Sequence, residues 1–242
     1  PFWPLIDEMW PDATDAAIAS DRLRDRLTAA LVRLERRLGL ANLELPISRL
    51  CTLEPFQWFA GHVLAHLPRF RDVYNDALAD YRRENKIRSR THPVSDLREQ
   101  DGWLESPFWI WKAGDSTRGR VFARQVQREV QLSDGQDVFA RLKLSPDMDA
   151  CCAVEGMQEL PAQGLRLRTR ALTTTLFARL CLGDLFVHGI GGAKYDEMTD
   201  RIIERFFGLA APAYLTMSAT LHLPLGEPYD ADESEATRLL GL

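Results

Sequence analysis

The chain has 242 residues, 45% of them hydrophobic and 27% charged, which is enough for a large hydrophobic core and excludes disorder throughout. Its formal net charge of −5 argues against nonspecific nucleic-acid binding, which requires a basic surface, so we expect no nucleic-acid partner. Four cysteines without CxxC spacing, no signal peptide and no apolar run of about 18 residues predict a cytoplasmic protein with no membrane partner.

Residues 1–92 predict a helical unit. Leucines recur at three- and four-residue spacing between residues 12 and 38, which places them on one face of a helix. A second helix is expected to begin at Pro55, because proline is favoured in the first helical turn. Pro68 either kinks this helix or starts a third one, which is expected to run to about Lys86.

Residues 93–150 predict a small antiparallel β unit. Short apolar segments with period-two alternation are typical of half-buried strands, and Ser133-Asp134-Gly135 suits a hairpin turn between two of them. These segments are 121–123, 130–132 and 138–142. Three tryptophans, Trp103, Trp109 and Trp111, precede them. Packing is the simpler role for these rings, and a stacking platform or a protein interface is the alternative.

Residues 151–242 predict an α/β layer with a partly parallel sheet, because strand-like and helix-like segments alternate along them. The expected order is a strand (165–168), a helix (172–182), a short apolar stretch (185–187), a glycine-rich turn, a helix (194–207) and a strand (214–223). The chain opens with an apolar Pro-Phe-Trp-Pro segment rather than with methionine, so we expect that a stretch before Pro1 belongs to the same protein.

The segment from His188 to Asp196 reads His-Gly-Ile-Gly-Gly-Ala-Lys-Tyr-Asp and is the strongest candidate for a ligand site. Its glycines, Gly189, Gly191 and Gly192, are expected to allow positive φ angles and the close approach of a ligand to the main chain. The helix that follows presents free amide groups and the positive end of its dipole, and both favour an anion.

Polar side chains around this turn supply candidate functional groups. Lys194 and Tyr195 are expected to contact the ligand, and Lys194 adds a positive charge in the first helical turn. His188 is the candidate general acid or base, and Asp196 or Asp200, one helical turn apart, would orient it. The spacing matches neither GxGxxG nor GxxxxGK[ST], so it identifies no nucleotide class, and a turn packed for structural reasons is the alternative.

Three arginines, Arg166, Arg168 and Arg170, alternate along the expected strand at 165–168 and its exit. Period two places all three on one side, where they repel unless carboxylates or a ligand anion lie opposite. We therefore expect Arg166 and Arg168 to contribute to ligand binding, with Arg168 on a strand next to the glycine-rich turn and holding a phosphate or carboxylate group. A solvent-exposed edge strand is the alternative.

Two further patterns have simpler structural interpretations. His62 and His66 are one helical turn apart, which permits joint metal ligation, but no third ligand is evident and we expect no metal site. The polar residues of the expected strand at 214–223, among them His222, share one side. This is typical of a surface strand and also of a strand that lines a cleft.

The stretch from His188 to Asp196 resembles one that is shared by a group of uncharacterised bacterial proteins. The longer segment from residue 164 to 223, about a quarter of the chain, is more distantly similar to the cysteine-adding enzymes of bacillithiol synthesis. Those enzymes carry a strand with Leu-Arg-Pro, a helix, a Gly-Gly turn into another helix, then a proline and a strand. The matching positions here are Leu167-Arg168, Gly191-Gly192 and Pro212, with Thr169 in place of the first proline.

The resemblance implies a Rossmann-like core with helical insertions, a pocket for a nucleotide- or amino-sugar-related ligand, and ligase- or transferase-like chemistry. We expect a bacterial α/β enzyme, or part of one, that binds an anionic small molecule at the glycine-rich helix start, with a nucleotide as one candidate cofactor. The alternative is a non-catalytic binding or scaffold protein, in which the glycine turn is structural and residues 103–111 form an aromatic interface.

Overall fold

The computed structural model describes residues 23–115, 117–135, 137–147 and 150–220, and positions 4, 7, 8, 10, 11, 14 and 15. The chain divides into two compact units, one of residues 1–45 and 219–242 and the other of residues 46–218. In the first unit, helix α2 (Leu23–Arg37) lies within the helix expected between residues 12 and 38. Gly39 follows it with a φ of +80°, which glycine adopts readily at a helix end.

The second unit contains six helices and eight strands within the described residues. Its helices are α3 (Ile47–Leu50), α4 (Glu54–Ala65), α5 (Leu67–Glu84), α6 (Ala150–Ala162), α7 (Ala171–Cys181) and α8 (Ile190–Ile202), which continues into a π-helical turn, η1 (Ile203–Phe207). Its strands are β1 (Glu99–Gln100), β2 (Trp103–Lys112), β3 (Gly119–Val126), β4 (Glu129–Ser133), β5 (Val138–Leu142), β6 (Leu165–Thr169), β7 (Phe186–Gly189) and β8 (Tyr214–Met217).

The two prolines of the helical region both lie in first turns. Pro55 is in the first turn of α4 and Pro68 in the first turn of α5. A proline is tolerated there because its missing N–H would have no partner within the helix. Pro68 therefore starts a third helix and does not kink the second.

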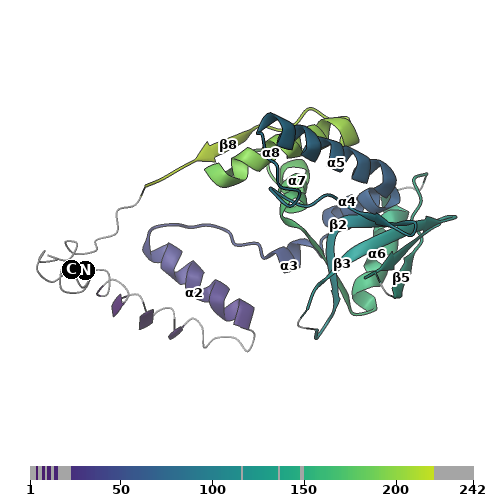
Figure 1. Cartoon of the computed structure of the whole chain (residues 1–242). Helices are drawn as coiled ribbons and strands as arrows, with labels where there is room; N and C mark the ends of the chain where they lie inside the picture. The colour runs from purple at the N-terminus through teal and green to yellow at the C-terminus, as the bar shows by residue number, and fades with distance from the viewer. Residues whose placement is uncertain are drawn as a thin grey trace, which may run out of the picture. The chain divides into compact units, whose positions relative to one another are not determined.

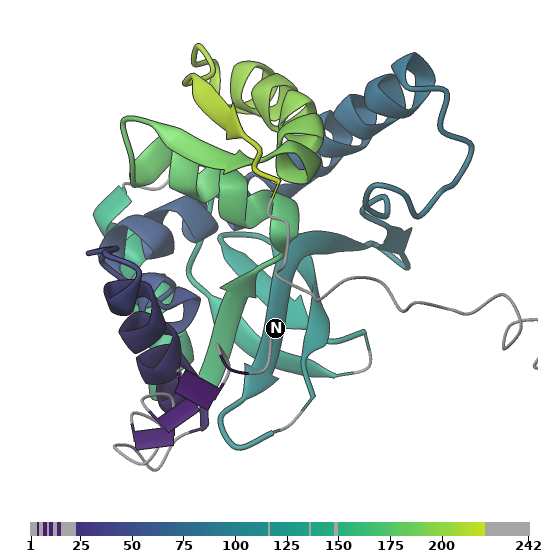
Figure 2. The ribbon, with the colours of Figure 1, turned by 90° about the vertical axis from the view of Figure 1, so that its left-hand side faces the viewer.

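Six strands form one antiparallel sheet, drawn in teal and green in Figure 2. Strands β1 to β5 follow one another in order, and β6 pairs with β2 from Phe108 onward. Gly135, between β4 and β5, has a φ of +99°, and its amide donates a hydrogen bond to Oγ of Ser133. The expected hairpin turn and the antiparallel pairing of these strands are therefore confirmed.

The Rossmann-like, partly parallel arrangement expected for residues 151–242 is wrong for this main sheet. Strand β6 runs antiparallel to β2, with Thr169 opposite Phe108 and Leu167 opposite Ile110. The physical reason is that the apolar side of β6 continues the buried face of β2, so both strands fill the same core. Among the described residues, the only parallel pairing joins β7 to β8 in a separate two-stranded sheet.

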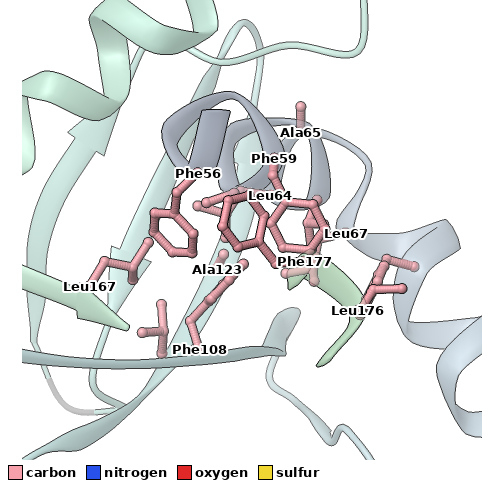
Figure 3. Packing of buried hydrophobic residues seen from close by; sticks show 14 of the residues in the cluster. Phe56, Phe59, Leu64, Ala65, Leu67, Phe108, Ala123, Leu167, Leu176 and Phe177 are labelled. Atoms are coloured by element: carbon pink, nitrogen blue, oxygen red, sulfur yellow. The ribbon is translucent and has the colours of Figure 1, made fainter. Parts of the chain in front are cut away.

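One hydrophobic core joins the helices to the inner face of the sheet (Figure 3). The ring of Phe56 in α4 contacts Phe108 in β2 and Phe177 in α7 edge-on, at centroid distances of 6.2 and 5.4 Å. The core thus takes side chains from all three expected ranges, 1–92, 93–150 and 151–242. Those ranges do not form separate compact units, because residues 46–218 form one.

Candidate functional site

The segment from His188 to Asp196 lies in a β-α-β unit, at the top of the view in Figure 2. Strand β7 pairs in parallel with β8, and α8 connects the two strands. α8 packs beside α5 (Figure 1) and against α7, which also packs on β6. β7 runs directly into α8, so the carboxyl end of the strand meets the N-terminus of the helix. Parallel α/β units bind ligands at this end of their strands.

The first turn of α8 has no side-chain cap. Gly189 precedes the helix with an extended backbone (φ −73°, ψ 163°), and it is exposed together with residues 190–192. The first N–H groups of a helix have no partner within the helix, and the helix dipole adds positive potential. The turn therefore offers exposed donors to an anion.

The backbone conformation of the turn does not require glycine, but the room available for a Cβ atom requires it at one position. Gly189, Gly191 and Gly192 all have φ angles outside the left-handed region, so the expected positive φ is wrong for these residues. A Cβ atom on Gly192 would lie 2.7 Å from Nδ1 of His188, whereas one on Gly189 or Gly191 would meet no atom within 4 Å. Gly192 is therefore the glycine that allows the imidazole to lie against the helix.

The imidazole of His188 is held from several sides. Its Nε2 lies 3.4 Å from Oδ2 of Asp196, and its ring contacts those of Phe186 and Tyr214, each at a centroid distance of 5.0 Å. Nε2 of His188 and Oδ2 of Asp196 are both buried and have no hydrogen-bond partner among the described residues, so their approach is an electrostatic contact and not a hydrogen bond. The two aromatic rings and the contact with Asp196 restrict the orientation of the imidazole, whose side chain is 14% exposed.

The Asp196 carboxylate is buried and has two partners besides His188, a threonine hydroxyl and an arginine guanidinium. Oγ1 of Thr199 donates a hydrogen bond to its Oδ1 at 3.0 Å, and Nη1 of Arg179 lies 3.3 Å from its Oδ2. Burial raises the pKa of Asp196, and the hydrogen bond from Thr199 and the charges of Arg179 and His188 oppose that rise. Such a carboxylate favours one orientation of a neighbouring imidazole through electrostatic attraction.

Arg179 of α7 joins several parts of this site. The residue is only 3% exposed, and its guanidinium pairs with Asp196 and, at 2.5 Å, with Asp200. It also donates a hydrogen bond to the carbonyl oxygen of Pro212 and lies over the ring of Tyr214, with Cζ 4.8 Å from the centroid. Arg179 therefore ties α7, α8 and the start of β8 to one another.

The sequence analysis missed Arg179, although its spacing carried a signal. Leu172, Leu176 and Arg179 recur at intervals of four and three residues, and all three are buried on one face of α7. A charged residue within a buried stripe requires an ion-pair partner. Asp184 is the nearest carboxylate along the sequence, and those of the following helix come next.

The other predicted residues of α8 take different directions. Lys194 is exposed, as expected for a residue near the ligand. Tyr195 instead packs toward the preceding region of the chain, with ring centroids 6.3 Å from Tyr81 and 6.0 Å from His92. Asp200 pairs with Arg179, so it acts on His188 only through that arginine and Asp196.

The last strand is shorter than the one expected at 214–223. β8 ends at Met217, and His222 lies outside the described residues. The Tyr214 hydroxyl donates a hydrogen bond to the carbonyl oxygen of Ala193 at 3.3 Å, whereas Leu215 and Met217 are exposed. Tyr214 therefore connects β8 to the first turn of α8, a contact that the sequence analysis did not predict.

The structure places Arg166 and Arg168 in the other sheet. Both are on β6, opposite Trp111 and Trp109 of β2, and they share one side of the strand as expected. Arg170 follows on the same side and pairs with the buried Glu105 at 2.8 Å, so a carboxylate does lie opposite one of the three arginines. β6 and β7 belong to different sheets, so the expectation that Arg168 lies on a strand next to His188 is wrong.

His62 and His66 belong to an aromatic cluster. Their rings lie 4.6 Å apart, and both contact Phe206. Burial lowers the pKa of both histidines, and the positive charge of Arg69 lowers it further. Within the described part of the chain, no group of three or more His, Cys, Asp or Glu side chains could hold a metal ion.

The arrangement at the glycine turn combines two chemical groups, an oriented imidazole and a set of uncapped amide donors.

No protein-family model matches the chain, and no curated protein sequence matches it. None of the described helices is both long enough and apolar enough to cross a membrane.

Proposed function

We propose that the chain is a bacterial enzyme, or part of one, that binds an anionic small molecule through a phosphate or carboxylate group at the N-terminus of α8. One observation carries the proposal: the His188 imidazole contacts the buried Asp196 carboxylate beside the uncapped amides of the helix. An imidazole placed next to an anion site can give a proton to the bound molecule or take one from it.

In this proposal each residue of the turn has a separate role. The amides of residues 190–192 hold the anion, and Lys194 adds a mobile positive charge. His188 is the general acid or base, with Nε2 beside Asp196 and Nδ1 beside Gly192 in the first turn of the helix. Asp196 orients the imidazole, and Asp200 is a positioning residue because it reaches Asp196 through Arg179.

Ligase- or transferase-like chemistry is the reaction class that we propose, on the resemblance to the cysteine-adding enzymes of bacillithiol synthesis. The parallel β7-α8-β8 unit supports this, because Gly191-Gly192 opens α8 and Pro212 precedes β8 in the order of the resemblance. A nucleotide is one candidate ligand, since phosphate groups suit a helix N-terminus. We further propose a cytoplasmic location, which the free thiols of Cys51 and Cys181 support.

A thermal-shift screen of nucleotides, sugar phosphates and amino acids tests this function. A ligand at about 100 times its Kd stabilises the folded protein by about 2.7 kcal/mol, which is a rise in Tm of about 5–10 °C for a chain of this size. His188→Ala and Lys194→Ala should reduce or abolish the rise. Arg128→Ala serves as the matched control, because this arginine is 84% exposed and lies between β3 and β4.

Two results would count against the proposal. One is that no compound in the screen stabilises the unsubstituted protein. The other is that the stabilisation persists unchanged in both His188→Ala and Lys194→Ala. Either result favours the non-catalytic binding or scaffold protein, in which the glycine turn serves packing alone.

A further inference from the structure

The outer face of the antiparallel sheet carries arginine and tryptophan side chains together. Alternate residues of β6 and of the second half of β2 point to this face, because Leu165, Leu167, Phe108 and Ile110 between them are buried in the core. Arg124 of β3 and Trp103 of β2 extend it, with Cζ of the arginine 4.5 Å from the ring centroid. We call it the arginine–tryptophan face, and its centre consists of Trp109, Trp111, Arg118, Arg166, Arg168 and Arg170.

Guanidinium groups contact the tryptophan rings of this face directly. Trp109 is contacted by two of them, with Cζ of Arg118 at 5.0 Å and Cζ of Arg170 at 5.1 Å from its centroid. Cζ of Arg168 lies 5.5 Å from the centroid of Trp111. All three tryptophans of β2 are half-buried, so none of them is enclosed in the core. The face therefore offers planar aromatic and cationic groups side by side.

The positive charge of the face exceeds what its buried carboxylate can neutralise. Glu105 is fully buried and pairs with Arg98 at 3.2 Å, Arg120 at 3.1 Å and Arg170 at 2.8 Å. One negative charge thus meets three positive ones. This excess is local, because the chain as a whole has a formal net charge of −5.

Acidic side chains gather at one end of the sheet. Asp115, Asp134 and Asp137 line an open hollow together with Trp111 and Arg118, at the loops that follow β2 and β4. An anionic partner would be repelled from this end. Its favourable path therefore avoids the part of the face that lines the hollow and runs from Arg124 over Trp109 to Arg168.

We propose that the arginine–tryptophan face binds single-stranded nucleic acid, with phosphates held by the arginines and bases stacked on the tryptophan rings and guanidinium planes. The partner must be anionic to match the excess of arginines and must expose flat aromatic groups to match the rings. This inference goes beyond the function proposed at the glycine turn and shares no residue with it.

A single strand fits this face better than a duplex. The bases of a duplex are stacked within it, whereas single strands can splay their bases onto aromatic side chains of an antiparallel sheet. The net charge of −5 predicts no nucleic-acid partner, but that prediction averages over the whole surface. Binding depends on the potential at the face itself.

Fluorescence anisotropy with labelled oligo(dT) and oligo(U) of about 12 nucleotides tests the proposal, since this length lies within the site size of single-strand-binding sheets. We expect binding at low salt that weakens linearly on a log–log plot against salt concentration. Trp109→Ala should weaken binding by about 5- to 150-fold, the loss typical of one base stack. Arg166→Gln should reduce the salt slope by about 0.7, which corresponds to one lost phosphate contact.

Arg128→Gln is the matched control, because it removes the same charge at an exposed position between β3 and β4. It should leave the affinity unchanged, and Arg166→Gln keeps the test valid if Trp109→Ala fails to fold. The proposal is overturned by no binding at low salt, by equal affinity for a duplex of the same length, or by equal losses in Arg128→Gln and Arg166→Gln. None of these results bears on the ligand screen at the glycine turn.

Discussion

Replacing Gly192 with alanine should push the His188 imidazole off Asp196. The new Cβ atom would lie 2.7 Å from Nδ1 and 3.4 Å from Cγ and Cε1 of the ring. The ring has little room to move, because those of Phe186 and Tyr214 both contact it at 5.0 Å. Alanine is favoured over glycine within a helix by about 1 kcal/mol, but overpacking at a filled site costs about 1–3 kcal/mol.

Gly191→Ala is the matched control, because its Cβ would meet no atom within 4 Å. We expect this variant to be more stable than the unsubstituted protein by up to about 1 kcal/mol and more stable than Gly192→Ala by about 1–3 kcal/mol in urea unfolding. Gly192→Ala should also shift the NMR resonances of the His188 ring, because the new Cβ atom displaces it. Equal stabilisation by both alanines would refute the contact between His188 and the helix.

Three further substitutions test the packing and the charges. Arg179→Met leaves two aspartates without their buried partner and should cost about 3–5 kcal/mol in urea unfolding; a cost below about 1 kcal/mol would contradict the buried network. Burial raises the pKa of Tyr74 to about 12, so the folded protein favours the protonated phenol. This contribution to the free energy of unfolding is fully present below pH 10, and it should decrease by about 3 kcal/mol as the pH rises to 12. Tyr74→Phe should flatten that loss, and an unchanged pH dependence would show that Tyr74 is not its source. Gly61→Val should cost about 1–3 kcal/mol in thermal unfolding, because a Cβ there would already lie 3.3 Å from Cβ of Ala153; a neutral result would contradict the close packing of α4 on α6.

Local features of the fold could be predicted from the sequence. Pro55 marks a helix start and Ser133-Asp134-Gly135 marks a turn, because each depends on the conformations of a few consecutive residues. The direction of β6 depends instead on pairing with β2, more than 50 residues earlier in the chain. Alternation of helices and strands suggested a parallel sheet, but the shared buried face of Phe108 and Leu167 decided the pairing.

The same distinction applies to the candidate site. The sequence predicted that Asp196 would orient His188, and the two side chains do lie together, because both belong to one continuous turn and helix. Arg179 and Tyr214 come from other elements and were missed. Arg168 was expected near His188, but nothing in the spacing of residues shows that β6 and β7 join different sheets.

The most direct test of the anion site is the response of individual amides in a ¹⁵N–¹H NMR titration with inorganic phosphate. The proposal predicts saturable shifts at the amides of Ile190, Gly191 and Gly192 together with a shift of the His188 ring resonances. These shifts should be reduced in Lys194→Ala. An absence of shifts at these three amides, or shifts of equal size scattered over the other helix N-termini, would contradict a ligand site at the start of α8.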